Sequence, residues 1–489
     1  MELLWIKDIF SRKFVGFSGV SKVEFIFHLF PILLTADYRA PPIISNTTYI
    51  PAWNAPSDVC AKLFNISLDL SFYPLKGNPQ ASAIGQTVTL FYVEKLGIYP
   101  HIVTSTGKHK HGGIPQLGNI SEHLDKAEKD ILKYLPKDEL GLAVIDWEEW
   151  RPIWIRNWLD KIVYRNESIN LVKRKNPLLS DKAAETQAKQ EFEAAGKEFM
   201  LRTLELGQRL RPNNYWGFYL FPDCYNHNYG ANRPYTGACS DLEKQRNNEL
   251  SWLWKASTAL FPSIYLNTKL KKSPKAALFS RNRVNEAIRL SRVRDQKNPL
   301  PVFVYIRLVF TDNTTEFLSE IDLVNTIGET YALGASGVII WGSFNLTRRQ
   351  ERCSMLHDYM KKTFNPYLIN LTLAAKICSQ ALCQDQGFCT RKFWNSTDYL
   401  HLNSENFVIK FESCDKFIVF GQPSVQDLIQ LSNNFDCSCF GNVSCRKNEN
   451  ITSIKKIRVC ISEEVCISAL INPGRRVLPP RKYRTRLSP

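Results

Sequence analysis

Residues 141–152 read GLAVIDWEEWRP, an apolar run that ends in three acidic residues. The run from Leu142 to Ile145 predicts a strand buried on both faces, with the acids at its carboxyl end. Because side chains alternate along a strand, Asp146 and Glu148 are expected on one face, about 6.6 Å apart along the chain, with Trp147 on the other. Two carboxylates this close cannot both ionise easily, so the pKa of one should rise.

The acidic pair has two interpretations. A protonated acid beside an ionised one is what cleavage of a glycosidic bond requires, whereas acids at strand ends are also common as helix caps and surface charges. The ends of the other predicted strands favour the first interpretation. They carry Tyr219, Tyr265, Asp312 and Trp341. A ring of acids and aromatic residues at the rim of a barrel is typical of a sugar-binding site, although each aromatic residue alone can equally belong to the core.

Short apolar runs alternate with helical patterns from about residue 86 to residue 343. Besides 142–145, the predicted strands are 87–93, 216–220, 262–266, 301–309 and 337–341. Ser121 is the predicted cap of a helix that runs to Leu135, and Ser180 the cap of a longer helix. This alternation predicts a parallel α/β fold, for which a barrel is the commonest solution of this size. A doubly wound open sheet is the alternative, but no glycine-rich phosphate loop follows any strand.

The composition is that of a packed, basic globular protein. Of 489 residues, 44% are apolar and 22% are charged, and 63 Lys and Arg against 47 Asp and Glu give a formal net charge of +16. Such a charge suits nucleic acid, an anionic membrane surface or an acidic polymer as partner. No apolar run reaches 18 residues, so no internal membrane span is expected.

The amino end has the pattern of an export signal. Basic residues precede the apolar stretch 25–34 and small residues follow it, which predicts a signal peptide over residues 1–35, with a buried strand as the alternative. Thirteen cysteines, none in this leader, favour an oxidising compartment. Ten glycosylation sequons lie at Asn46, Asn65, Asn119, Asn166, Asn313, Asn345, Asn370, Asn395, Asn442 and Asn450. An extracellular location removes nucleic acid as a partner and favours an acidic extracellular polymer.

The last part of the chain changes in character. Six cysteines crowd into the 68 residues from Cys378 to Cys445, which predicts a disulfide-stapled module. A zinc site is the competing interpretation, but no paired C-x-x-C spacing occurs and histidine is scarce there, so no metal is expected. Residues 451–489 are predicted to be a basic, flexible tail, rich in Pro and Arg from Asn472 onward. No apolar stretch ends the chain, so no lipid anchor is expected.

These residues resemble the motifs of the animal hyaluronidase family. The match runs from about residue 40 to residue 466 and rests on two long, specific runs, 146–152 and 216–226. Shorter matching runs are 52–56, 262–265 and 337–342. Within the family the resemblance is closest to the sperm-surface members, and it extends into the cysteine-rich part and the segment 399–403.

The resemblance implies a distorted TIM-like barrel over residues 36–372, followed by an EGF-like module over residues 373–450. It also implies an endo-acting enzyme that needs no cofactor. Such an enzyme would hydrolyse hyaluronan at β-1,4 bonds between N-acetylglucosamine and glucuronate with retention of configuration. The sperm-surface members imply a role in penetrating the hyaluronan-rich coat of the egg, at the sperm surface or in the acrosome, with peripheral membrane or egg-coat association.

The resemblance also implies residue roles. Glu148 would be the proton donor and later the base, while the substrate's own acetamido oxygen attacks the sugar. Asp146 and Tyr265 would orient and polarise that acetamide, with an ionised Asp146 facing the developing positive charge. The cleft would be lined by Tyr219, Arg283, Asp312 and Trp341. Arg246 would meet a substrate carboxylate, with a lone surface arginine as the alternative.

The family pattern further implies disulfide pairs. Five are Cys60–Cys353, Cys224–Cys239, Cys378–Cys389, Cys383–Cys437 and Cys439–Cys445. Cys460 and Cys466 would form a sixth. Cys414 is then the odd residue, either a buried thiol or an intermolecular crosslinker.

Two other functions remain open at this point. One is a hyaluronan-binding or sperm–egg adhesion protein with secondary catalysis, although the intact acidic and aromatic residues favour the enzyme. The other is a chondroitin-preferring hydrolase, because the two polymers differ only in the orientation of one hydroxyl and in sulfation. The basic stretch 269–275 is either a secondary hyaluronan track or a solvated loop.

Overall fold

The computed structural model describes residues 37–79, 84–230, 234–412, 416–462 and 465–471. The predicted signal peptide, Cys414 and the chain after residue 471 lie outside the described residues. From residue 37 onward the described residues belong to one compact unit.

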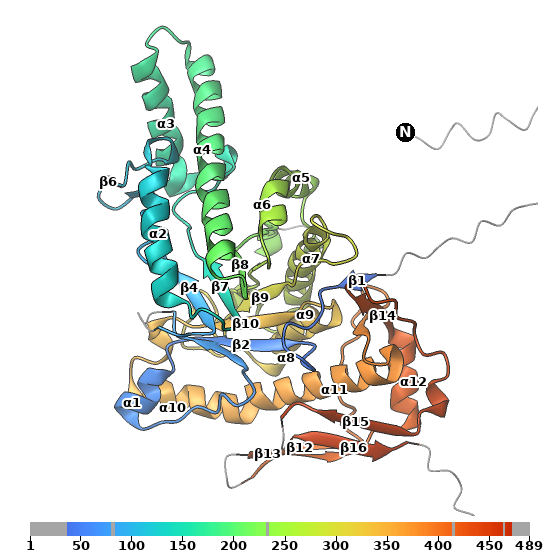
Figure 1. The fold of residues 1–489 in the computed structure, drawn as a ribbon. Coiled ribbons are helices and arrows are strands. Elements are labelled where there is room, and N and C mark those ends of the chain that lie inside the picture. Colours follow the sequence, from blue (N-terminus) through green and yellow to red (C-terminus); the bar gives the residue numbers. More distant parts are fainter. Residues whose placement is uncertain (1–36, 80–83, 231–233, 413–415, 463–464, 472–489) are drawn as a thin grey trace, which may run out of the picture. The chain divides into compact units, whose positions relative to one another are not determined.

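Two parallel sheets lie at the centre of this unit (Figure 1). One contains, in order, β3 (Leu75–Gly77), β2 (Ile50–Asn54), β10 (Gly337–Trp341) and β9 (Phe303–Ile306). The other contains β4 (Val88–Phe91), β7 (Gly141–Ile145) and β8 (Asn214–Phe218). Every neighbouring pair is parallel. The predicted α/β class with parallel strands is therefore confirmed.

Residues 260–263 connect the two sheets without forming a regular strand. On one side, an isolated parallel bridge joins Phe261 to Tyr219, which directly follows β8. On the other side, two such bridges join Leu260 to Val302 and Ser263 to Tyr305, at β9. The predicted strand 262–266 is therefore wrong, because Pro262 has no N–H to donate and interrupts the ladder. Next to β3 and β4, the Thr87 N–H donates to the Lys76 carbonyl at 3.1 Å and links the sheets a second time.

The strands are buried on both faces, as their continuous apolar runs predict. Alternate residues such as Leu142 and Val144 belong to a small cluster between the sheets, whereas Ala143 and Ile145 belong to the larger core outside them. The apolar pattern does not reveal β2 and β3, because their sequences, IPAWN and LKG, are short and contain a proline or polar residues.

Helices and short strands surround the sheets. They are α1 (Asp58–Phe64), β5 (His101–Val103), β6 (Lys108–Lys110), α2 (Ile120–Tyr134), α3 (Ile162–Lys175), α4 (Asp181–Leu210), α5 (Asp241–Glu249), α6 (Ser251–Ala256), α7 (Pro274–Ser291), α8 (Glu320–Leu323), α9 (Glu329–Ala332) and α10 (Gln350–Tyr359). Ser180 caps α4 as predicted, since its hydroxyl accepts a first-turn N–H. The cap of α2 is Asn119 rather than the predicted Ser121, because the Asn119 side chain accepts the Glu122 N–H at 3.2 Å.

The C-terminal part mixes helices with small antiparallel sheets. Its elements are α11 (Asn365–Cys383), β11 (Gly387–Arg391), β12 (Phe407–Glu412), β13 (Lys416–Gly421), α12 (Val425–Asn434), β14 (Phe435–Phe440), β15 (Lys456–Cys460) and β16 (Cys466–Leu470), and β1 (Tyr38–Arg39) pairs with β14. The border predicted at residue 372 falls inside α11. The flexible tail is wrong for residues 451–471, because β15 and β16 form a hairpin closed by a disulfide.

A buried ion cluster ties the C-terminal part to the sheets. The carboxylate of Glu329, on α9, accepts two bonds from Arg281 of α7 (2.7 and 3.0 Å) and one from Arg391 of β11 (2.9 Å). The Tyr399 hydroxyl donates a fourth bond at 2.6 Å. The side chains of Glu329 and Arg391 are 0% exposed and that of Arg281 is 3% exposed. Loss of this carboxylate would leave two buried guanidinium groups without a compensating negative charge.

We expect Glu329→Gln to lower the free energy of unfolding by about 3–5 kcal/mol, because the neutral amide no longer compensates the two arginines. Urea unfolding followed by circular dichroism measures this change. The control is Glu198→Gln on α4, whose half-exposed ion pair with Arg202 (3.9 Å) should contribute less than about 1 kcal/mol. Equal losses of unfolding free energy in the two variants would contradict the view that the cluster stabilises the junction with the C-terminal part.

Candidate active site

The two predicted acids lie in the loop that directly follows β7, which ends at Ile145. Trp147, between them, is buried and stacks on Tyr99 with 4.2 Å between the ring centroids. Because neighbouring side chains of an extended segment point to opposite sides, Asp146 and Glu148 face away from this core. Burial raises the pKa of Asp146, and the negative charge of Glu148 raises it further, as expected for adjacent carboxyl groups.

Asp146 is the acid of the pair that is enclosed by the protein. Its Oδ1 is fully buried and has no hydrogen-bond partner among the described residues. Burial raises the pKa of Asp146 well above its usual value, and the charges of Glu148 and Glu149 raise it further against the opposing effect of Arg151. One pKa of the pair is thus raised, as the sequence predicts. This environment makes ionisation of Asp146, which the resemblance implies, less favourable than that of an exposed aspartate.

Glu148, unlike Asp146, is accessible to solvent. Its side chain is 49% exposed, and its Oε1 lies 3.2 Å from Nη2 of Arg151. Nη1 of the same arginine donates to the Glu148 carbonyl at 2.9 Å and fixes the loop. A carboxyl group that is exposed and held in this way can exchange a proton with a group that enters from solvent.

Aromatic rings gather beside the acids. The rings of Tyr219 and Tyr265 lie 6.2 Å apart, and Tyr265 stacks on Trp341 at 6.0 Å. The guanidinium of Arg307 lies 5.7 Å from the ring of Tyr265 and 5.0 Å from that of Trp341. Asp146 raises the pKa of both tyrosines, although burial is the largest cause. The structure therefore brings Tyr219, Tyr265 and Trp341 together with the acidic pair.

Sequence patterns do not reveal three residues of this site, Tyr92, Tyr305 and Arg307. The Trp341 indole N–H donates to the Tyr92 hydroxyl at 3.2 Å. Burial, and then Asp146 and Glu148, raise the pKa of Tyr92 to about 12. The Tyr305 hydroxyl is buried without a partner among the described residues, and burial followed by the charge of Asp146 raises its pKa well above the usual value. Both tyrosines belong to apolar runs that predict strands. The sequence signal that could have identified them as site residues is a hydroxyl group in an otherwise apolar strand.

A cavity of about 480 Å³ is lined by Tyr219 and Tyr265, together with residues of the loops after β7 and β8. Three of its lining residues, Leu159, Leu220 and Tyr225, have the left-handed backbone conformation, with φ of 53°, 73° and 50°. Residues other than glycine rarely adopt this conformation, and such strain concentrates at functional sites. The cavity is therefore a candidate binding site next to the acids.

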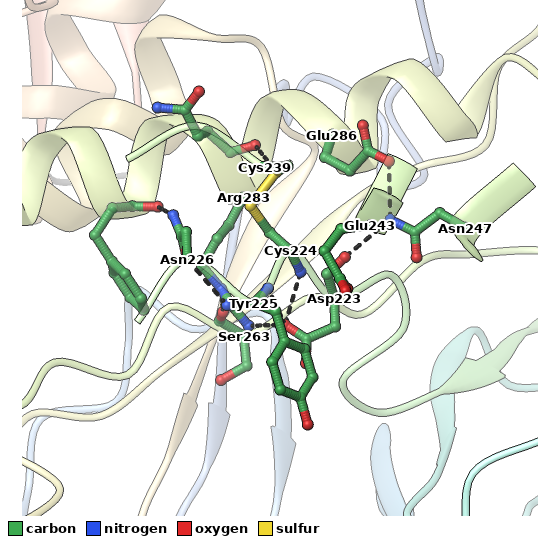
Figure 2. Close-up of polar contacts among 12 residues, drawn as sticks. Asp223, Cys224, Tyr225, Asn226, Cys239, Glu243, Asn247, Ser263, Arg283 and Glu286 are labelled. Atoms are coloured by element: carbon green, nitrogen blue, oxygen red, sulfur yellow. Dashed lines mark hydrogen bonds and ion pairs between the residues drawn. A yellow bond between two sulfur atoms is a disulfide. The ribbon is translucent and has the colours of Figure 1, made fainter. Parts of the chain in front are cut away.

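Arg283 lines this cavity, but its guanidinium is engaged within the protein (Figure 2). It pairs with Asp223 at 2.7 Å and donates to the Ser263 carbonyl at 2.6 Å and to Oδ1 of Asn226 at 3.3 Å. Burial acts to raise the pKa of Asp223, but Arg283 and nearby N–H groups lower it overall. Arg283 thus shapes the loop 221–226, and its direct contact with a substrate remains a prediction.

The other two predicted cleft residues also bind protein groups. Arg246 pairs with Glu243 at 2.6 Å, and Glu243 pairs with Arg156 as well. Asp312 accepts bonds from the N–H (2.9 Å) and the hydroxyl (2.5 Å) of Thr268. These contacts fix the segments around the cavity. Their roles toward a substrate remain predictions.

A family model described as hyaluronidase matches residues 38–450. The chain belongs to the hyaluronidase family of glycoside hydrolases. It is 53% identical over 485 residues to hyaluronidase PH-20 of Homo sapiens, covering 99% of this chain and 94% of the relative. It is 56% identical over 474 residues to hyaluronidase PH-20 of Macaca fascicularis, covering 97% and 92%. The enzyme class predicted from the sequence is therefore confirmed.

A solved structure is also similar to this hyaluronidase. Bee venom hyaluronidase in complex with a hyaluronic acid tetramer matches with a TM-score of 0.58 and 29% sequence identity, covering 65% of this chain and 98% of that chain.

The disulfides of this hyaluronidase are the six pairs that the resemblance implies. They are Cys60–Cys353, Cys224–Cys239, Cys378–Cys389, Cys383–Cys437, Cys439–Cys445 and Cys460–Cys466. Among the sequon asparagines, Asn313 and Asn370 are half-buried and the other eight are exposed. Asn370 lies inside α11 and accepts the Leu402 N–H at 3.1 Å, a contact that a glycan would disturb. In the described ranges, no helix is both long and apolar enough to cross a membrane.

We expect Asp146→Asn to stabilise this hyaluronidase at pH 7 but not at pH 4. An acid with a raised native pKa keeps its proton while the unfolded chain loses it above about pH 4, so wild-type stability falls as the pH rises from there. Asparagine removes this pH-dependent cost. Thermal unfolding midpoints of the two proteins at both pH values measure the effect, with Asp125→Asn, an exposed aspartate of α2, as control. A difference that does not grow with pH would contradict the raised pKa.

Proposed function

We propose that this protein is an endo-acting hyaluronidase that hydrolyses the β-1,4 bonds between N-acetylglucosamine and glucuronate in hyaluronan. One observation carries the proposal: a buried carboxyl group with a raised pKa, Asp146, adjoins a half-exposed carboxyl group, Glu148, beside stacked aromatic rings. Aromatic faces suit sugar rings, and two carboxyl groups in different environments supply acid and base chemistry. The hyaluronic acid tetramer in the bee venom enzyme supports the class of substrate.

In this proposal Glu148 is the proton donor, although Asp146 is the acid whose pKa burial raises. The two neighbouring carboxyl groups share one proton, because both cannot ionise easily. A substrate that covers the exposed Glu148 removes water from it and so raises its affinity for the proton. The proton then passes to Glu148, and Asp146 becomes the ionised group that faces the developing positive charge.

The attacking group in the proposed reaction is the acetamido oxygen of the substrate. An enzyme with its own nucleophile needs two carboxyl groups about 5–5.5 Å apart that flank the bond, whereas Asp146 and Glu148 lie on one side of one short loop. The acetamido oxygen bonds to C1 while the glycosidic bond breaks and Glu148 protonates the leaving oxygen. Water then adds to C1, returns a proton to Glu148 and opens the cyclic intermediate, so configuration is retained. Tyr265 orients the acetamide.

We also propose that the two sheets form a distorted barrel and that residues 373–450 form an EGF-like module. The links through residues 260–263 and between Thr87 and Lys76 support the barrel, and three disulfides within 378–445 support the module. The resemblance to sperm-surface members supports export and a role in penetrating the egg coat. An adhesion protein and a chondroitin-preferring hydrolase are the alternative functions.

Digestion of purified hyaluronan and chondroitin between about pH 4 and pH 7 separates these functions. Faster release of reducing ends from hyaluronan supports the proposal. Binding without release would support the adhesion protein, and faster cleavage of chondroitin the other hydrolase.

We expect Glu148→Gln to lower the turnover of hyaluronan by roughly 10²–10⁴-fold, because the amide cannot donate the proton. Its circular dichroism spectrum and unfolding midpoint should equal those of the wild type, since the side chain is half-exposed. The control is Glu149→Gln, the neighbouring acid, which the proposal does not use for proton transfer. A well-folded Glu148→Gln variant with wild-type turnover would refute the assignment.

We expect a stable thiazoline analogue of the cyclised sugar to inhibit this hyaluronidase, because it imitates the product of acetamide attack. Tyr265→Phe should weaken that inhibition, since the hydroxyl that orients the acetamide is lost, while Tyr215→Phe serves as a control at a half-buried tyrosine on β8. Inhibition constants measure both effects. Mass-spectrometric detection of a covalent sugar ester on Asp146 or Glu148 would contradict the mechanism.

A further inference from the structure

The hairpin formed by β5 and β6 concentrates positive and titratable charge. Three of the eight histidines of the chain, His101, His109 and His111, lie within residues 101–111, together with Lys108 and Lys110. This segment contains no acidic residue. Its positive charge therefore increases when the imidazole rings take up protons.

The charges of this hairpin face solvent. All three residues of β6 and His111 are exposed. Within the part of the chain that the structure describes, neither Lys108 nor Lys110 has an ion-pair partner. The acid that acts on His111 is Glu122 of α2, while burial, His101 and Lys110 lower the pKa of His111. Positive groups that repel one another in this way are stabilised by an anionic ligand.

The base of the hairpin is fixed to the catalytic loop. Tyr99 stacks on Trp147 (4.2 Å) and on Trp150 (5.0 Å), and the Trp150 indole N–H donates to the Pro100 carbonyl at 2.8 Å. The Tyr164 hydroxyl of α3 holds the other side, where it accepts the Ile102 N–H at 3.0 Å. The hairpin is thus a rigid extension of the loop that carries the acids, next to α2 and α3 (Figure 1).

We propose that this hairpin is an accessory binding site for an anionic polysaccharide, which holds the part of the substrate chain that extends beyond the cleft. The inference rests on the proposed function, and it adds a binding site outside the acidic and aromatic cluster. A polymer with one carboxylate per disaccharide meets the exposed lysines and histidines with complementary charge. Because a bound anion favours the protonated imidazoles, binding takes up protons and the affinity rises as the pH falls.

The test measures the binding of long hyaluronan and of a hyaluronan tetrasaccharide to full-length Glu148→Gln protein at pH 5.5 and pH 7.5. We expect K108A/K110A to weaken binding of the polymer by roughly 2- to 30-fold and to leave the tetrasaccharide unchanged. H109Q/H111Q should remove most of the pH dependence and the proton uptake that calorimetry in different buffers records. The matched control is K455A/K456A, which replaces two exposed lysines at β15 and should leave the affinity for both ligands unchanged.

Each other outcome overturns the proposal. If K108A/K110A binds the polymer as tightly as the control does, the hairpin does not contact the polymer. If K108A/K110A weakens binding of the polymer and of the tetrasaccharide equally, the two lysines belong to the cleft and not to an accessory site. Anionic phosphatidylserine vesicles that bind the parent but not K108A/K110A, with unchanged hyaluronan binding, identify a membrane site instead. A failure of the proposed function is recognised separately, because the wild-type protein with Glu148 intact then does not cleave hyaluronan, whereas the accessory site is judged by binding alone.

Discussion

The burial of Trp147 is the constraint on which the site depends. Its ring packs against Tyr99, His123 and Phe218 in the core outside the sheets. Because adjacent side chains of an extended loop point to opposite sides, a fixed Trp147 sends both neighbouring carboxyl groups toward the aromatic cluster. The same stack holds the residues that lead into the β5–β6 hairpin. A single buried ring therefore sets the geometry of the acids and of the basic hairpin together.

Two enclosed carboxyl groups of this protein show how structural and chemical roles differ. Glu329 is completely buried, yet two arginines and a tyrosine satisfy it, so it stabilises the junction of the C-terminal part with the sheets. Asp146 has a buried oxygen without a partner among the described residues and a pKa raised by that environment. An unsatisfied group of this kind lowers stability, and proteins retain such groups where the chemistry requires them.

The sequence predicts those features that depend on local pattern. The continuous apolar runs identify β7 and β10, and the family motifs identify the acidic pair and the disulfides. Features that depend on tertiary context are predicted less well. The apolar neighbours of Pro262 predict a strand, but the proline interrupts the hydrogen-bond ladder. Asn119 and Ser121 are both suitable helix caps by residue type, and only the backbone conformation shows that Asn119 is the cap. Spacing indicates that the pKa of one carboxyl group is raised, and the enclosure of Asp146 identifies it as that group.

The disulfide between Cys60 and Cys353 spans 293 residues and joins α1 to α10. During synthesis at about 5–20 residues per second, Cys60 leaves the ribosome roughly 15–60 s before its partner exists. Cys224 and Cys239, only 15 residues apart, appear within that interval. The first thiol therefore waits while two others become available, and the native cross-link depends on early local closure of the Cys224–Cys239 pair or on later exchange by an isomerase.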